Sequence, residues 1–500
     1  MEDILDLDAT ALSERIREKS ITCVRVMEAT LDRIEQLNPQ VNAIINLADR
    51  SKLIQRAQEY DSAPRKGWLH GIPIAIKDLF NAQGFPTTMG GSILSQWLSP
   101  SPATANDEYV QRLVDEGAIV IGKTNAPEYG LGSHTFNSVW GVTRNPYHVQ
   151  RSAGGSSGGA AVALATRMLS VVDGSDKMGS LRNPAGWNNH YSLRPTAGNI
   201  VETTAPKPIL PYPLSTVGPM ARTPRDLHKL LQTLTPSTTT ATVVDDNDDK
   251  QKGGTIQQQR IGWLGDWGGA YPMEEGILDI CHSSLQQREG LFQVTTIEEP
   301  LFDSRQLWVS WTTIRADSVL QAWRLSAGVV GSLVLRLLLS ILPPNLWPIK
   351  GELVWELRQG LKITPSQLND AIQVAQEWSS RLDRLFQEED KFDVLALPSA
   401  QVWPFPVDWN WPRTINHVDM DTYHRWMEVT VPCSLAGLPC VTLPAGFHKG
   451  LPMGIQILGP RGSDSKLLAI AQAYHESIDW PSQRRPPILE ECQKRNNPPT

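Results

Sequence analysis

The sequence predicts an α/β protein with a partly parallel sheet. Two short apolar segments, "GIPIAIKD" (71–78) and "GAIVIGKTN" (117–125), have the length and composition of buried strands, and a helix-like stretch from Tyr109 to Glu116 separates them. This alternation is typical of parallel strands joined through a helix. The 500 residues show no break of composition that divides them into equal halves. Length and composition alone therefore allow one large domain or two.

Helices are expected before these strands. Val24, Met27, Leu31 and Ile34 recur at helical spacing, and Asn38-Pro39 is expected to end the run. We interpret this N-terminal part as scaffold.

The second half of the chain begins after a polar and acidic stretch, residues 236–259, which is short of large apolar side chains. Such a composition indicates an exposed, mobile linker or insertion. Beyond it "RIGWLGDW" predicts a new strand. Further buried strands with proline and glycine ends are expected in "DVLALPS", "CVTLPAG" and "MGIQILG".

Composition favours a protein whose partner is a small molecule. Hydrophobic residues make up 40% of the chain, charged residues 20%, and the formal net charge is −7, which argues against general affinity for nucleic acid or anionic membranes. Five cysteines without a CxxC spacing indicate neither a zinc site nor a disulfide framework and fit a reducing interior. The acidic start lacks the features of a signal peptide, so we expect a cytoplasmic protein.

One segment, residues 325–342, is apolar enough to raise the question of a membrane span. It is 18 residues long and carries a charge at Arg336. A spanning helix needs about 20 apolar residues without a central charge. We therefore expect a buried or pocket-lining helix and no stable membrane span, while contact with a membrane surface stays open.

The stretch "RSAGGSSGGAA", residues 151–161, allows three interpretations. It fits the G-x-S-x-G nucleophile elbow in two registers, around Ser156 or Ser157. It also has the composition of a flexible linker or of a phosphate-binding loop. The elbow needs a buried strand before the turn, and the preceding "RNPYHVQRSA" is polar and contains proline. The alanine-rich segment that follows predicts a helix, so the glycines are expected on a loop that opens it.

A second serine, Ser180, lies in "DGSDKMGSLRNPA", 24 residues after Ser156. "GGSSGG" followed at this spacing by an aspartate, a glycine, a serine and R-x-P-A resembles the amidase signature family of serine hydrolases. The likeness continues in "GIPIAIKDLF", "GAIVIGKTNAPEYG", "LRPTAG", "STVGPMARTPRDL", "AGLPCVTLPAGF" and "LPMGIQILGP". It implies a single large domain with a mixed, mostly parallel central sheet covered by helices on both sides, and neither a metal nor an organic cofactor.

The resemblance also implies a catalytic triad. Ser180 corresponds to the nucleophile, Ser156 to a bridging serine held in a cis peptide, and Lys77 of "AIKD" to the base, while Ser157 becomes a hydrogen-bonding neighbour. The chemistry is reasonable, because a serine hydroxyl is a poor nucleophile unless a base removes its proton. A lysine can be that base only where its surroundings favour the neutral amine.

The turn before Ser180 departs from the family pattern. Most members carry a sequence like D-[TI]-G-G-S, and this chain has "DKMGS" at 176–180. A positive φ at Met178 would be strained. The charge of Lys177 would favour an acidic substrate, lower the basicity of Lys77, or simply reach solvent. We expect backbone N–H groups of this turn to stabilise the oxyanion. The residues expected to contact substrate are Gly130 (through its backbone), Ser156, Lys177, Met178, Gly179 and Ser180.

The sequence thus predicts an amidase that hydrolyses a carboxylic amide C–N bond through an acyl-enzyme on Ser180. The apolar stretch 325–342 and the aromatic run 403–412 suggest an apolar or aryl acyl group. We expect no nucleic-acid partner and leave a homodimer open. Two alternatives remain: a catalytically weakened binding protein on the same fold, and an amidotransferase-type subunit, which would need partner subunits. The expected arrangement is N-terminal helices (1–67), a catalytic core (68–235), the linker or insertion (236–259), and the remaining sheet with the substrate pocket (260–500).

Overall fold

The computed structural model describes residues 3–91, 101–202, 214–236, 256–341, 349–387 and 391–490. Within helix α11, the side chains of residues 326–338 and 340 are not described. Most of the expected linker, 237–255, and residue 342 therefore lie outside the described residues.

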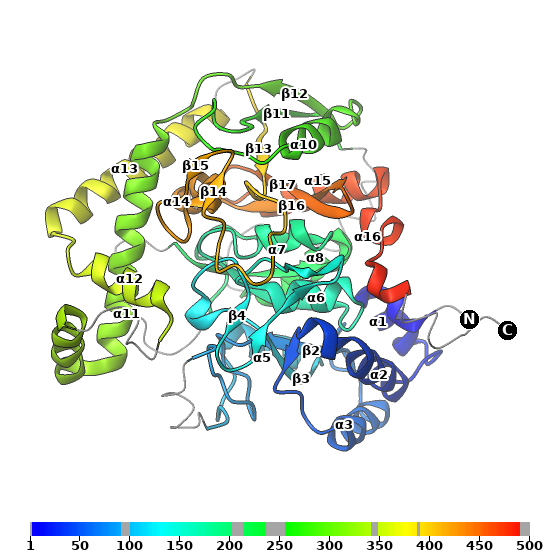
Figure 1. Cartoon of the computed structure of the whole chain (residues 1–500). Helices are drawn as coiled ribbons and strands as arrows, with labels where there is room; N and C mark the ends of the chain where they lie inside the picture. The colour runs from blue at the N-terminus through cyan, green and yellow to red at the C-terminus, as the bar shows by residue number, and fades with distance from the viewer. Residues whose placement is uncertain are drawn as a thin grey trace.

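The centre of the molecule is a mixed sheet with the strand order β12-β11-β13-β17-β16-β9-β10-β8 (Figure 1). Its strands are β8 (Val171–Asp176), β9 (Tyr191–Arg194), β10 (Thr216–Ala221), β11 (Gln259–Trp263), β12 (Phe292–Thr296), β13 (Val394–Pro398), β16 (Cys440–His448) and β17 (Leu451–Leu458). Because strands from both halves of the sequence pair with one another in this sheet, the chain forms one α/β domain. The expected strands of the second half are thereby confirmed.

The two strands that first indicated the fold lie in a smaller sheet with the order β1-β3-β2. It consists of β1 (Ile44–Ile45), β2 (Pro73–Lys77) and β3 (Ile119–Thr124). As expected, β2 and β3 are parallel, and α5 (Glu108–Asp115) lies between them in the chain. The backbone N–H of Lys77 donates to Asp173 Oδ1 on β8 at 3.0 Å, so the end of β2 is fixed against the edge of the large sheet.

The large sheet is mixed, as predicted, but the expected parallel majority is wrong. Its parallel pairs are β11–β12 and β11–β13, whereas β13–β17, β16–β17, β9–β16, β9–β10 and β8–β10 are antiparallel. The clearest reason is the link between β16 and β17, where Lys449 and Gly450 have φ angles of 48° and 81°. Two consecutive left-handed residues form a tight turn that reverses the chain and joins antiparallel strands.

Helices flank the sheets, and Figure 1 shows α11, α12 and α13 grouped at one side of the molecule, away from the chain termini. The helices not yet placed are α1 (Ala9–Arg17), α2 (Cys23–Val41), α3 (Arg50–Ser62), α6 (Gly158–Ala165), α7 (Arg182–Trp187), α8 (Pro224–Leu234), α10 (Ile277–Gln286), α11 (Ser304–Ile341), α12 (Gly351–Gly360), α13 (Pro365–Gln387), α14 (Val431–Ala436), α15 (Asp464–Ser477) and α16 (Trp480–Gln483). Short 3-10 helices lie at Ile4–Asp6, Glu128–Gly130 and Arg425–Thr430. Two-residue to five-residue strands form the hairpins β4–β5 (Phe136–Asn137, Gly141–Val142), β6–β7 (Arg144–Asn145, His148–Ser152) and β14–β15 (Thr414–Ile415, Val418–Asp419).

Helix α2 has the expected apolar face but does not end at Asn38-Pro39. It continues to Val41, whose side chain is fully buried, and Asn42 ends it in the left-handed conformation with its N–H on the Asn38 carbonyl at 2.7 Å. Burial of the last turn and the left-handed cap hold the helix past the proline.

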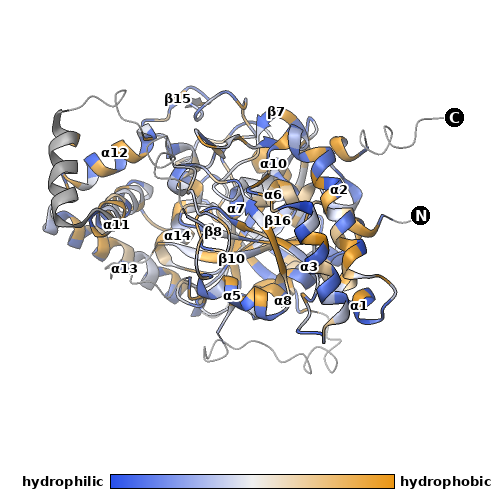
Figure 2. Cartoon of the chain, turned by 90° about the horizontal axis from the view of Figure 1, so that it is seen from below, coloured by the Kyte–Doolittle hydropathy of each residue, from blue (hydrophilic) through white to orange (hydrophobic). Residues whose placement is uncertain are grey.

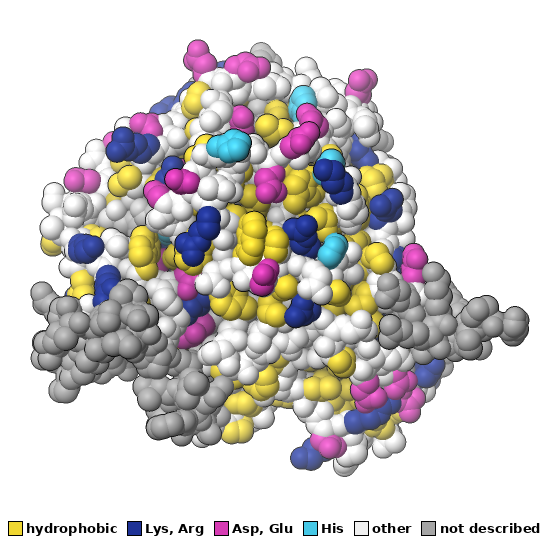
Figure 3. Space-filling view, in the orientation of Figure 1, with side chains coloured by type: hydrophobic (Ala, Val, Ile, Leu, Met, Phe, Trp, Pro, Cys, Tyr) yellow, Lys and Arg dark blue, Asp and Glu magenta, His cyan; other side chains and the backbone are white. Residues whose placement is uncertain are grey.

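Helix α11 contains the apolar stretch expected to be helical, as far as Ile341. Within the described residues, no helix combines the length and the apolar character that crossing a bilayer requires. Figure 2 shows strands such as β10 and β16 coloured as hydrophobic inside the molecule, while helices near the surface, such as α2, alternate between hydrophilic and hydrophobic residues. Acidic and basic side chains are interspersed over the face seen in Figure 3.

Candidate active site

Lys77, the predicted base, is the last residue of β2 and has no exposed surface. Its Nζ lies 2.8 Å from Oγ of Ser156, 2.8 Å from Oγ of Ser157 and 3.0 Å from Oγ of Ser175. The structure thus places Lys77 and Ser156 together, as the resemblance implied. The direct contacts of Ser157 and Ser175 with the amine go beyond what the sequence indicated.

The environment of Lys77 favours its neutral form. Burial lowers its pKa to about 7, although the carboxylates of Asp173, Asp176 and Glu202 act in the opposite direction. A lysine in water has a pKa near 10.4 and is almost fully protonated at neutral pH. Here a substantial fraction of the amine is neutral near pH 7 and able to accept a proton.

The glycine-rich loop brings Ser156 to Lys77, and the peptide bond between Gly155 and Ser156 is cis. Two of its glycines leave no room for a side chain: a Cβ at Gly158 would lie 2.3 Å from Thr135 Oγ1, and one at Gly159 would lie 2.4 Å from the Asn125 N atom. The loop opens α6, as predicted. A strand, β7, does precede the loop, but it belongs to a separate two-stranded hairpin and is largely exposed, so it is not the buried strand that an elbow needs.

Ser180 lies on the turn that follows β8 at the edge of the large sheet. Asp176, the last residue of β8, accepts from the N–H groups of Gly179 at 2.8 Å and Leu181 at 3.1 Å. It also forms a fully buried ion pair with Arg182 at 2.9 Å. Burial alone would raise the pKa of Asp176, but Arg182 and then Arg194 outweigh it and hold the pKa well below its usual range. The carboxylate stays ionised and braces the turn.

The departure at 177–178 causes no backbone strain. Gly179 takes the positive φ of the turn, 78°, and Met178 is not among the residues with positive φ. A Cβ at Gly179 would also lie 2.7 Å from Thr430 Cγ2, so this position requires glycine on two grounds. Met178 is buried, and Lys177 extends along the wall with its Nζ 3.2 Å from Ser318 Oγ on α11.

A cavity of about 540 Å³ brings most of these residues together. Gly130 presents only its backbone there, because a Cβ would lie 2.8 Å from Leu79 Cδ1. Of the predicted site residues other than Lys77, all but Gly179 line the cavity. The lining residues are Leu79, Phe80, Met89, Tyr129, Gly130, Leu131, Gly132, Ser133, Ser156, Ser175, Lys177, Met178, Ser180, Glu202, Ser215, Arg315, Ser318, Val319, Ala322, Trp323, Leu353 and Met427.

The expected pocket-shaping segments are not the ones that shape this cavity. The aromatic run 403–412 does not line it, and Phe405 instead packs on Trp187 and Trp426. Helix α11 does line it, but through Arg315 to Trp323, before the stretch 325–342. The apolar character expected of the pocket comes mainly from other elements.

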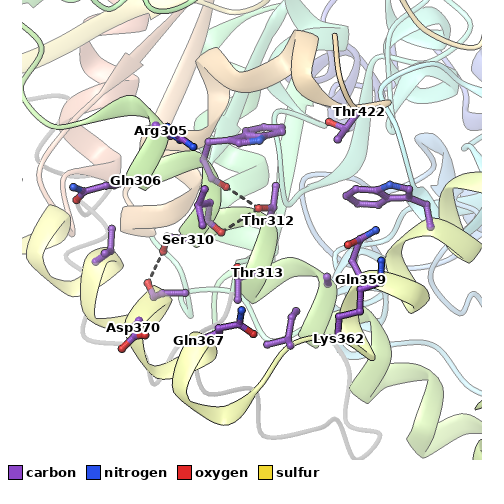
Figure 4. A pocket seen from close by; sticks show the side chains of 17 residues that line it. Arg305, Gln306, Ser310, Thr312, Thr313, Gln359, Lys362, Gln367, Asp370 and Thr422 are labelled. Atoms are coloured by element: carbon purple, nitrogen blue, oxygen red, sulfur yellow. Dashed lines mark hydrogen bonds between the residues drawn. The ribbon is translucent and has the colours of Figure 1, made fainter.

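A second cavity of about 600 Å³ lies between α11, α12 and α13 (Figure 4). Its labelled side chains, among them Arg305, Thr312, Lys362 and Gln367, come from these helices and their connections. None of the predicted site residues lines it.

Comparison with known proteins decides the family. The model of the Amidase family matches residues 25–468. This chain belongs to the amidase signature family. It is accordingly an enzyme that hydrolyses amides.

Relatives cover nearly the whole chain. A glutamyl-tRNA(Gln) amidotransferase subunit from Pseudomonas putida is 30% identical over 95% of this chain and 98% of its own length, and the corresponding protein of Chloroflexus aurantiacus is 29% identical over 97% and 99%. Among solved structures, a bacterial aryl acylamidase of the amidase signature family matches with a TM-score of 0.81, 26% identity and 99% of both chains. A 6-aminohexanoate cyclic dimer hydrolase has the same fold, with a TM-score of 0.81, 23% identity, and 98% and 100% of the two chains. These matches confirm the resemblance and the fold class.

Proposed function

We propose that this amidase cleaves its substrate through an acyl-enzyme on Ser180, with Ser156 and Lys77 relaying the proton. The observation that carries the proposal is the fully buried Lys77 amine, 2.8 Å from Ser156 Oγ, in a site where burial lowers its pKa to about 7. Ser156 and Ser180 line the same cavity. A base, a bridging hydroxyl and an accessible second hydroxyl are the parts that nucleophilic catalysis by serine needs.

The reaction begins when Ser180 attacks the amide carbonyl carbon and its proton passes through Ser156 to Lys77. The negative charge then forms on the carbonyl oxygen, where backbone N–H groups of the turn 177–180 stabilise it, each donor being worth about 3 kcal/mol. Collapse of this intermediate breaks the C–N bond, and the proton returns from Lys77 to the departing amine. Water, activated by the same relay, then hydrolyses the ester on Ser180.

Ser157 and Ser175 hold the amine of Lys77 in place. Both hydroxyls lie within hydrogen-bond distance of Nζ, at 2.8 and 3.0 Å. When Lys77 takes the proton, these oxygens accept hydrogen bonds from the ammonium and stabilise a charge that burial disfavours. Neither serine needs to attack substrate.

The apolar walls of the cavity support an apolar or aryl group in the substrate. Leu79, Phe80, Val319 and Trp323 are among the residues that would contact it, and burial of such groups is favourable by about 25 cal/mol per Å² of apolar surface. The similar aryl acylamidase is consistent with this class.

The proposal is tested with a fluorophosphonate probe followed by mass spectrometry of the labelled peptide. We expect labelling of Ser180 in the wild type, none in Ser180→Ala and a strong decrease in Lys77→Ala. Ser157→Ala serves as the comparison, because a nucleophile elbow centred on Ser157 would lose labelling there and keep it in Ser180→Ala. Folded wild-type protein that is not labelled would contradict the proposal and support a binding protein on this fold.

The alternative of an amidotransferase-type subunit is favoured by the names of the curated relatives. An amidase that works alone should release amine from simple anilides as an isolated chain. An amidotransferase component should remain inactive on them and release ammonia from glutamine only when partner chains are added. A screen of anilides and glutamine with the isolated chain separates the two.

A further inference from the structure

Arg315 lines the substrate cavity from α11, and the proposed chemistry does not use it. Its guanidinium is held from behind: Nε forms an ion pair with Glu356 Oε1, and Nη2 donates to the Tyr423 hydroxyl at 2.6 Å. Tyr423 in turn donates to Glu356 Oε1 at 2.6 Å. Glu356 is fully buried and does not line the cavity. Arg315 is therefore a positioned cation with its counterion on the side away from the substrate.

The guanidinium has donors left over. Arginine carries five N–H groups, and Nε and Nη2 use theirs on Glu356 and Tyr423. Among the described residues, no hydrogen-bond acceptor is found for Nη1. Because Arg315 borders the cavity, an acceptor on a bound substrate can satisfy these N–H groups.

A second cation lies on the same wall. Lys177 Nζ is 3.2 Å from Ser318 Oγ, and Ser318 Oγ donates to the Arg315 carbonyl oxygen at 2.7 Å. Lys177 thus reaches α11 one turn from Arg315. The charged residues that line the cavity are Lys177, Arg315 and Glu202, so the positive charge of its wall exceeds the negative.

We propose that Arg315, assisted by Lys177, is an anion-recognition subsite, and that the substrate is an amide carrying a carboxylate in addition to its apolar segment. A guanidinium fixed on one edge offers its remaining N–H groups in the planar geometry that a carboxylate matches. The inference deepens the proposed function and rests on it. It gives Lys177, the unusual residue of the turn, a role in selecting the substrate.

The second cavity supplies a matched control. Arg305 also lies on α11 but faces the other cavity (Figure 4) and is exposed. Arg305→Gln makes the same change of charge on the same helix and leaves the substrate cavity intact.

The experiment compares kcat/KM for the neutral hexanoic anilide with that for carboxylated partners of two kinds. Monoanilides of four- to eight-carbon dicarboxylic acids carry the charge on the acyl side, and 4-(hexanoylamino)benzoate carries it on the amine side. We expect one carboxylated substrate to be preferred at least tenfold. Arg315→Gln should abolish that preference and change kcat/KM for the neutral anilide less than threefold, Lys177→Met should reduce it, and Arg305→Gln should leave it unchanged.

A second variant and a binding measurement keep the two proposals separable. Because Arg315→Gln leaves the Glu356 charge buried, Arg315→Gln/Glu356→Gln is measured beside it. Calorimetric binding of the same ligands to Ser180→Ala reports recognition without turnover. Hydrolysis without discrimination, or a preference that survives in both Arg315 variants, overturns the inference alone. Discrimination in binding without hydrolysis by the wild type supports the subsite and overturns the proposed acyl-enzyme route.

Discussion

At the scale of single residues, Lys77 shows how burial creates reactivity. Its backbone N–H is fixed by Asp173 and its side chain is enclosed by the hydroxyls of Ser156, Ser157 and Ser175. These neutral partners replace water around the amine without forming an ion pair with it. The desolvation that this enclosure imposes makes the amine basic at the pH at which an amidase has to work.

We predict that kcat/KM rises with pH through about 7. Burial lowers the pKa of Lys77 to about 7, against the opposing carboxylates of Asp173, Asp176 and Glu202. Below that pH the amine is protonated and cannot accept the proton of Ser156, and above it the relay is ready. The measurement is kcat/KM for an anilide from pH 5.5 to 9, with Lys77→Met expected to be inactive throughout. A flat profile contradicts the prediction.

The same shift has a consequence for stability. A lysine whose pKa is lower in the folded than in the unfolded protein binds fewer protons in the folded state between the two pKa values. This group therefore makes folding less unfavourable as the pH rises from about 7 toward the unfolded value of about 10.4.

The residues that the sequence predicted are those carried by local motifs. Lys77, Ser156 and Ser180 stand in short stretches whose composition reflects tight loops, and the structure brings them to one place. Arg315 was not predicted, because its position depends on how a helix far along the chain packs beside the turn. Ser175 adjoins the motif "SDKMGS" and could have been considered from its closeness to Ser180.

At the scale of elements, α11 marks the limit of sequence interpretation. The apolar run 325–342 predicts a helix, and the helix is present to Ile341. Which part of it borders the substrate cavity depends on packing against other elements, and that part is the mixed segment from Arg315 to Trp323. Likewise the tryptophans of 403–412 indicate burial or contact, but composition does not say with what.

The attachment of α1 to α8 gives a prediction at this scale. Asp226 on α8 accepts from the N–H groups of Ala9 and Thr10, at 2.6 and 2.9 Å, and from the Thr10 hydroxyl. These N–H groups have no partners within their own helix, and the negative charge also suits the helix N-terminus. Asp226→Ala should lower the free energy of unfolding by about 3 kcal/mol, because several hydrogen bonds to one buried carboxylate are lost.

Urea denaturation measures this loss, and hydrogen exchange should show faster exchange of the α1 amides. Asp383→Ala is the control, since Asp383 is an exposed aspartate within α13. The kcat/KM of Asp226→Ala at low temperature should stay near that of the wild type, because the residue does not line the substrate cavity. Unchanged stability would show that α1 is held by its apolar face alone.

At the scale of the whole molecule, the large sheet unites the two halves of the chain. β9 from the first half pairs with β16 from the second, with Ser192 opposite Thr442. Period and composition identified most of these strands, but they do not specify the order or direction in which strands pair. That is why the mixed character was predictable and the antiparallel majority was not.

This pairing predicts how the chain behaves when it is divided. A cut within the polar stretch 237–255 leaves every strand of the large sheet whole but separates β9 from β16. The fragment 1–245 expressed alone would expose the edge of β9 and the apolar surfaces that α10, α14 and the second-half strands cover. Exposed apolar surface and an unpaired strand edge favour aggregation. We therefore expect each fragment alone to be insoluble, and the two expressed together to form a soluble complex that hydrolyses an anilide. Size-exclusion chromatography and an activity assay test this. A fragment 1–245 that folds alone, with a cooperative unfolding transition of its own, would show that the first half is an independent domain and that the pairing of β9 with β16 is an interface between domains.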